Sequence, residues 1–140
     1  THFHLVPGSD EQSFLLLGNG DQLSLRQMRR DQAIRPGEYD LVTLSACETA
    51  LGRQLRGEGV IGLSHAFLSA GARAVVVTLW RVRDQSAADF MREFYAEVAR
   101  GAEPAAALRS VRRRWMEGGG PRSAPAAWAP YILVGWRDGR

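Results

Sequence analysis

The sequence is poor in two residue types that often carry chemistry, because its 140 residues include one cysteine and no lysine. A single thiol cannot form a disulfide within the chain, so nothing requires an oxidising compartment and a cytoplasmic location is expected. The formal net charge is +3, and all 18 basic residues are arginine. A coding bias explains the missing lysine more simply than a need for guanidinium groups at every site.

Long hydrophobic runs are also missing. No stretch approaches the roughly 20 consecutive apolar residues that a membrane span needs, and no charged-then-apolar signal peptide is visible. A chain of 140 residues that is 45% apolar can bury one compact core but is too short for two domains. We therefore expect one domain and no membrane partner.

Three continuous apolar runs predict strands that are buried on both faces, as in a mostly parallel sheet. The runs are Leu41–Leu44, Ala74–Trp80 and Tyr131–Val134. A hairpin is predicted near the N-terminus, where Phe14–Leu17 is followed by the turn Gly18-Asn19-Gly20 and then by Gln22–Leu25.

Apolar residues at helical spacing predict three helices between these strands. The first two stop at Gly71 and Gly101, and the third begins at Pro104, a favoured first helical position, and ends at Gly118. Residues 118–125 are predicted to form a loop. Alternating strands and helices indicate an α/β fold with helical layers covering a sheet.

Cys47 follows the Leu41–Leu44 run at the start of a polar turn, which is where a nucleophile sits in parallel α/β folds. An imidazole within hydrogen-bond reach would convert its thiol to a thiolate, and His2 lies 45 positions upstream. Caspase-type proteases show a spacing of roughly 50 residues, although their Gln-Ala-Cys-x-Gly signature is absent here. A buried structural cysteine is the alternative, and spacing alone does not decide between the two.

Four blocks of sequence, in the same order, resemble the C-terminal part of a CHAT domain. They are DLVTLSACETALG (40–52), GEGVIGLSHAFLSAGARAVVVTLWRVRD (57–84), FYAEVARG (94–101) and WAPYILVG (128–135). CHAT domains are caspase-like and separase-like modules that are often fused to tetratricopeptide repeats. The resemblance implies that residues 1–140 are the C-terminal part of one such domain. It also implies a caspase-like, mostly parallel sheet in a three-layer α/β/α fold that lacks its N-terminal elements.

The resemblance implies a cysteine endopeptidase with Cys47 as nucleophile and His2 as general base. The family histidine is usually followed by glycine, whereas Phe3 follows it here. In caspase-like enzymes the backbone N–H after the histidine and that of the nucleophile hold the oxyanion, which gives Phe3 and Cys47 this role. His4 competes with His2, because a strand through Phe3 would place both histidines on the same face.

Asp84 ends a Leu-Trp-x-Val-x-Asp segment. In separase relatives the comparable aspartate lines the pocket for a basic P1 side chain, which implies cleavage after arginine or lysine. The alternative is a cap for a helix that starts near Ser86. Glu48 and Glu58 lie near the nucleophile in sequence and could orient the substrate, or equally could satisfy turn and helix-start N–H groups.

No metal or cofactor is expected. Three scattered histidines and one cysteine match no standard ligand spacing, and His65 is read as a helix-surface residue. Gly57–Gly62 matches GxGxxG but does not directly follow a strand, so a close contact between helix and sheet explains its glycines better than a nucleotide. The arginine cluster is read as a solvated helix face rather than a phosphate site; it comprises Arg109, Arg112, Arg113 and Arg114.

The expected partners are a protein or peptide substrate and a tetratricopeptide-repeat or sensor region in the same or a partner chain. The composition disfavours nucleic acid and membrane partners. The second function hypothesis is a catalytically inactive interaction module of the same fold, which the replacement of glycine by Phe3 favours.

Overall fold

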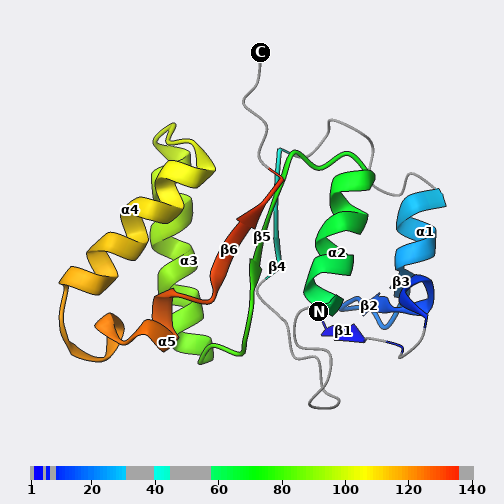
Figure 1. Ribbon diagram of the computed structural model, residues 1–140, viewed down its shortest axis with the longest axis horizontal. Helices are drawn as coiled ribbons and strands as arrows, with labels where there is room; N and C mark the ends of the chain where they lie inside the picture. The colour runs from blue at the N-terminus through cyan, green and yellow to red at the C-terminus, as the bar shows by residue number, and fades with distance from the viewer. Residues whose placement is uncertain (1, 5, 7–8, 31–39, 45–57, 136–140) are drawn as a thin grey trace.

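The computed structural model describes residues 2–4, 6, 9–30, 40–44 and 58–135. Figure 1 shows two small sheets with helices packed on them. The first sheet is antiparallel with the order β1-β2-β3, and the second has the order β4-β5-β6. None of the helices in these ranges is long and apolar enough to cross a membrane.

The antiparallel sheet contains β1 (His2–His4), β2 (Phe14–Leu16) and β3 (Gln22–Ser24). The predicted hairpin is confirmed, and Phe14 pairs with Ser24 across it. Its turn uses the predicted Asn-Gly pair: the Asp21 N–H donates to Asn19 Oδ1 at 3.1 Å, and Gly20 has a φ of 89°. Such a positive φ is cheap only for glycine, so the turn fixes where the two strands end.

A short helix that the sequence analysis missed follows the hairpin. Helix α1 spans Leu25–Arg30, and its first residue, Leu25, had been expected to end the second strand of the hairpin. Its start is a capping box, because the Gln27 N–H donates to Ser24 Oγ at 3.1 Å and the Ser24 N–H donates to Gln27 Oε1 at 2.9 Å. The Ser-x-x-Gln spacing was the available signal. A 3-10 turn, η1 (Asp10–Gln12), precedes β2.

The second sheet contains β4 (Leu41–Leu44), β5 (Ala74–Thr78) and β6 (Tyr131–Val134), in agreement with the three predicted strands. β4 and β5 are parallel, but β5 and β6 are antiparallel, so the described strands do not make a mostly parallel sheet. The reason is visible in Figure 1: the chain leaves the end of β5, runs up one helix and down the next, and returns to the same end. β6 must therefore run back against β5.

All three predicted helices are present as α2 (Glu58–Ser69), α3 (Asp84–Ala99) and α4 (Pro104–Glu117). The predicted loop 118–125 instead contains the 3-10 turn η2 (Gly120–Ser123), and the short helix α5 (Pro125–Trp128) begins at its end. Both begin with proline at a first or second position, where the missing N–H costs nothing. One turn is too short to show helical periodicity, so composition alone indicated a loop.

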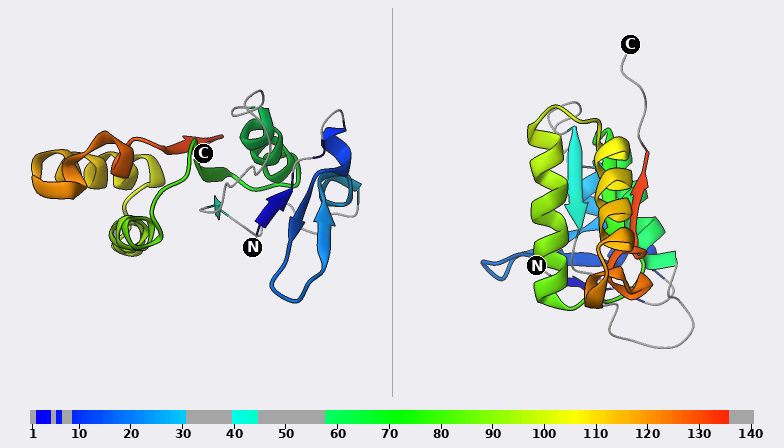
Figure 2. Two further views of the ribbon diagram at one scale, coloured as in Figure 1. Left: turned by 90° about the horizontal axis from the view of Figure 1, so that it is seen from below. Right: turned by 90° about the vertical axis from the view of Figure 1, so that its left-hand side faces the viewer.

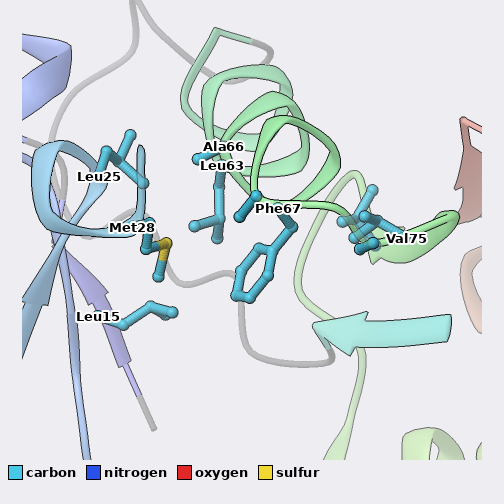
Figure 3. Packing of buried hydrophobic residues seen from close by; sticks show 10 residues of the cluster. Leu15, Leu25, Met28, Leu63, Ala66, Phe67 and Val75 are labelled. Carbon is cyan, nitrogen blue, oxygen red and sulfur yellow. The ribbon is translucent and has the colours of Figure 1, made fainter. Parts of the chain in front are cut away.

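The core is divided by the second sheet. Val75 and Val77 face one cluster and Val76 faces the other, as expected for alternating residues of a strand. The hairpin core lies between α1, α2 and the hairpin and contains Leu15, Leu25, Met28, Leu63 and Phe67, as Figure 3 shows. The helix-pair core lies against α3, α4 and α5 and contains Phe90, Phe94, Val111, Trp115 and Tyr131. The arrangement is mixed α/β, as predicted, whereas the caspase-like, mostly parallel sheet stays a prediction.

Candidate active site

The candidate site lies at the end of the molecule where β4 and β5 finish. The two strands are parallel and Leu44 pairs with Val77, so their carboxyl ends meet at one edge. Cys47 and Glu48 follow β4 closely but lie outside the described residues, so their predicted roles remain predictions. What the structure establishes is that the chain leaves β4 toward this edge.

Strand β1, which carries His2 and Phe3, lies at the same end of the molecule. Figures 1 and 2 place it beside the carboxyl end of β4 in all three views. The strand spans both histidines and pairs Phe3 with Leu15, as the prediction of a strand through Phe3 requires. The backbone that carries the predicted base is therefore close to the exit toward Cys47.

His4, the competing base, is exposed and occupies a definite position. It pairs with Phe14 of β2, and the two rings stack with centroids 5.0 Å apart and an interplanar angle of 15°. Cross-strand neighbours of this kind stabilise a hairpin. The His4 ring therefore packs against the hairpin through Phe14.

The sequence analysis extended β5 to Trp80, but the strand ends at Thr78. β6 begins at Tyr131, which pairs with Thr78, so the ladder has no partner residues beyond that point. The Leu79 N–H still donates to the Pro130 carbonyl at 2.9 Å. As a result Leu79 and Trp80 are 38% and 43% exposed and provide an apolar surface that the sequence analysis missed. The polar Arg81–Asp84 segment that follows was the available signal.

Asp84 is the first residue of α3 and is exposed. The prediction that it caps this helix is wrong, because Arg83 is the N-cap residue and no side-chain cap bond forms. Arg83 has extended φ and ψ of −61° and 135°, so the helix starts two residues before the predicted Ser86. Asp84 lies instead in the first turn, where a carboxylate interacts favourably with the helix dipole. Its backbone lies just beyond the end of β5.

Glu58 is the first residue of α2, so its backbone is at the helix start, as one of its two predicted readings requires. Residues 58–62 of the glycine-rich segment lie within α2. A Cβ built on Gly62 would meet no atom within 4 Å, so the predicted close contact of helix and sheet is wrong at this glycine. Because residues 58–62 are helical, this described part of the glycine-rich segment is not a loop that joins a strand to a helix.

His65 is exposed on α2, as predicted. The prediction of a solvated arginine face is only partly right. Arg114 donates through Nη1 to Glu97 at 2.7 Å, and hydrogen bonds to Glu97 raise its pKa despite partial burial. Burial lowers the pKa of Arg112, whereas Arg109 and Arg113 are exposed. Within the described ranges no three acidic, histidine or cysteine side chains gather as a metal site would need.

Comparison with known proteins agrees with the sequence resemblance. The chain is 34% identical to tetratricopeptide repeat protein 28 of Mus musculus over 121 residues, which is 86% of the chain. It is 33% identical to tetratricopeptide repeat protein 28 of Homo sapiens over 95 residues, or 68% of the chain. It spans about 4% of the length of each relative.

The CHAT domain family matches residues 1–136. A match over nearly the whole length, together with the two relatives, shows that this chain belongs to the CHAT domain family, which is a caspase-like peptidase family.

Proposed function

We propose that this chain is a cysteine endopeptidase module in which Cys47 is the nucleophile and His2 the general base. The observation that carries the proposal is the convergence of three backbone segments at one end of the molecule. These are β1 with His2, the exit of β4 toward Cys47, and the exit of β5 toward Asp84. A catalytic pair needs such convergence, because residues far apart in sequence must reach hydrogen-bond distance.

The chemistry follows from these roles. His2 takes the proton of the Cys47 thiol, and the thiolate attacks the scissile carbonyl carbon. The N–H groups of Phe3 and Cys47 hold the oxyanion. Collapse of this intermediate breaks the C–N bond, and His2 gives its proton to the leaving amine, which leaves a thioester on Cys47. Water activated by His2 then hydrolyses the thioester and frees the thiol.

For specificity we propose that Asp84 pairs with a basic P1 side chain. Its carboxylate is exposed in the first turn of α3, beside the end of β5, and the described residues give it no hydrogen-bond partner. Leu79 and Trp80 lie between the strand and this helix and offer exposed apolar contacts for the substrate. Glu48 and Glu58 stay secondary candidates for orienting it.

The module is proposed to act within a longer regulated protein in the cytoplasm. The named relatives are tetratricopeptide repeat proteins, which supports a repeat region in the same chain. We further propose that residues 1–140 are the C-terminal part of one caspase-like domain whose complete sheet is mostly parallel.

Substitutions in the intact protein test the function. Cys47→Ala should abolish cleavage of peptides with arginine at P1, and Asp84→Asn should remove the preference for a basic P1 over an apolar one. A preference of about 10³-fold is expected when a carboxylate is left unpaired by the wrong side chain. Asp40→Asn is the matched control, because Asp40 is an exposed acid before β4, at the opposite end of that strand from the candidate site. Full activity of Cys47→Ala would contradict the nucleophile, and an unaltered P1 preference in Asp84→Asn would contradict the pocket.

The second candidate is an inactive interaction module, which one observation favours. Phe3 replaces the usual glycine, and it is held in β1 opposite Leu15. A residue fixed in a ladder has less freedom than glycine to turn its N–H toward an oxyanion. Phe3→Gly separates the hypotheses. If Phe3 has abolished turnover, the wild type should be inactive and Phe3→Gly should cleave peptides, whereas in an active enzyme the wild type already cleaves them.

A further inference from the structure

A groove lies between helix α4 and strand β6, on elements that do not contribute to the candidate active site. Its volume is about 720 Å³. An apolar floor is formed by Leu108, Trp128 and Leu133, the edge of β6 adds Ile132 to the lining, and the α4 rim carries Arg109, Arg112, Arg113 and Met116. Figure 2 shows α4, α5 and β6 on one side of the molecule, with α3 on the other. We call this feature the arginine groove.

The three arginines of the groove lack ion pairs among the described residues, whereas other arginines of this region are paired. Arg114 and Arg122 form ion pairs with three carboxylates of α3, namely those of Asp89, Glu93 and Glu97. None of the described residues that line the groove is acidic. The helix pair therefore leaves its positive charge on one face, above an apolar floor.

Arg112 has the least favourable surroundings of the three. Its Nε is buried and has no hydrogen-bond partner in the described structure. A buried polar group without a partner costs free energy, and a charged one costs more. A carboxylate placed in the groove would supply the missing acceptor and offset part of that cost.

Strand β6 adds backbone groups to the same site. Among the described strands it pairs with β5 alone, so its outer edge presents unpaired N–H and C=O groups. An extended peptide can pair with such an edge, and alternate side chains then enter neighbouring pockets. Ile132 and Leu133 of this edge both line the groove, and Leu133 packs on the helix-pair side, where it belongs to the groove floor.

We propose that the arginine groove binds a short acidic segment of a partner protein, which adds to the edge of β6 as a strand and places an apolar side chain on the groove floor. Acidic side chains of the segment pair with Arg109, Arg112 and Arg113. Charged hydrogen bonds then provide selectivity, and apolar burial provides much of the affinity.

The charges favour this occupant over the two obvious others. A second copy of the chain would bring three arginines against three arginines, and like charges across an interface are unfavourable. Nucleic acid needs stacking platforms, but among the described residues of the groove the one aromatic ring is half-buried Trp128. Its Nε1 donates to the Ser123 carbonyl at 3.1 Å, which holds the ring in the floor.

Selection from a displayed library of random seven-residue peptides tests the proposal. The intact Cys47→Ala protein is the bait, so that peptides are not cleaved, and Ala105→Trp is used for counter-selection. Ala105 is an exposed residue of the groove near the start of α4, so tryptophan fills the groove without removing a charge. We expect the survivors to carry aspartate or glutamate around a central apolar residue.

Fluorescence anisotropy with the best selected peptide then measures each contact. Ala105→Trp and Arg112→Gln should each weaken binding about tenfold or more, and Arg109→Gln about threefold. Arg26→Gln is the matched control, with the same charge change at an exposed residue of α1, and should alter binding less than twofold. Thermal unfolding checks that each variant is folded.

Five outcomes would overturn the proposal. Selected peptides could be basic or without charge preference, or no peptide could survive the counter-selection. Ala105→Trp could leave the affinity unchanged. Single-stranded RNA could displace the peptide, which would assign the groove to nucleic acid. Light scattering could show a dimer that Ala105→Trp dissociates, which would assign it to a second copy.

Discussion

The two cores on either side of β5 are built differently. The helix-pair core is aromatic: Phe90 stacks on Tyr131 with centroids 4.0 Å apart and meets Trp115 edge-on at 5.1 Å. The described ion pairs of Arg114 and Arg122 lie beside it. The hairpin core is mainly aliphatic and joins segments far apart in sequence, such as Leu15 and Val75. β1, the strand with the candidate base, belongs to the hairpin side.

This difference suggests a division between scaffold and site. The helix-pair core is formed almost entirely within residues 76–133, so it is a local unit that holds β5 and β6 in place. The hairpin core sets the position of β1 relative to β4 and β5. Substitutions in the helix-pair core should therefore lower the stability of the fold. Substitutions in the hairpin core should lower it too, and should also disturb the candidate site.

The largest expected effect is on the helix-pair core. Phe90→Ala should lower the free energy of unfolding by about 3–5 kcal/mol, because the ring is fully buried between Tyr131 and Trp115. Urea unfolding measures this. Leu17→Ala is the control, since Leu17 is exposed, and should change stability by about 0.5 kcal/mol or less. Equal losses in both variants would remove the distinction between core and surface.

A second substitution compares the two sides directly. Met28→Ala in the hairpin core should cost about 3 kcal/mol, because Met28 is fully buried against α2. In protein that remains folded it should also slow alkylation of Cys47. Met91→Ala is the matched control on the helix-pair side, where Met91 is partly buried. If both methionine variants leave alkylation unchanged, the hairpin core does not position the site.

A smaller effect of opposite sign is expected at Tyr131. Its hydroxyl is buried without a hydrogen-bond partner among the described residues, so Tyr131→Phe should raise stability by about 1 kcal/mol. Burial also raises the pKa of Tyr131 to about 12 from 10.0. The unfolded chain therefore loses this proton more readily, and stability should fall as pH rises from 10 toward 12. Tyr131→Phe should lack that part of the alkaline loss, and a loss of stability at pH 7 would contradict the prediction.

The smallest effect concerns the ion pairs. Arg114→Gln should cost about 0.5–1 kcal/mol, because its pairs with Glu93 and Glu97 are partly exposed. The cost should shrink at high salt. Arg113→Gln is the neighbouring control, which has no ion pair among the described residues, and it should be near neutral. A salt-independent loss of several kcal/mol for Arg114→Gln would mean that packing rather than charge is responsible.

Much of the fold could be predicted from local pattern. β4 and β6 have the predicted bounds because a continuous apolar run marks a buried strand, and α4 begins at Pro104 as expected. Helix α1 was missed, since six residues show little periodicity. The end of β5 was misplaced because its last partner is set by β6, more than fifty positions away.

The candidate site, like the fold, could be predicted from the sequence only in part. The residues proposed from the sequence to carry the chemistry stay a prediction, and the structure places the backbone of His2, Asp84 and Glu58 at one end of the molecule. The sequence could not predict that Arg83 rather than Asp84 is the N-cap residue of α3, because this depends on backbone angles. The arginine groove was missed because its rim and floor come from α4, α5 and β6 together.

The pH dependence of Cys47 alkylation tests the central claim most directly. Iodoacetamide should modify Cys47 in the intact protein at a rate that is already high well below pH 8.5, the ordinary pKa of a thiol, because His2 favours the thiolate. In His2→Ala the profile should move to about pH 8.5, and in His4→Ala it should stay as in the wild type. A wild-type profile like that of a free thiol, or a shift in His4→Ala and not in His2→Ala, would contradict a Cys47–His2 pair.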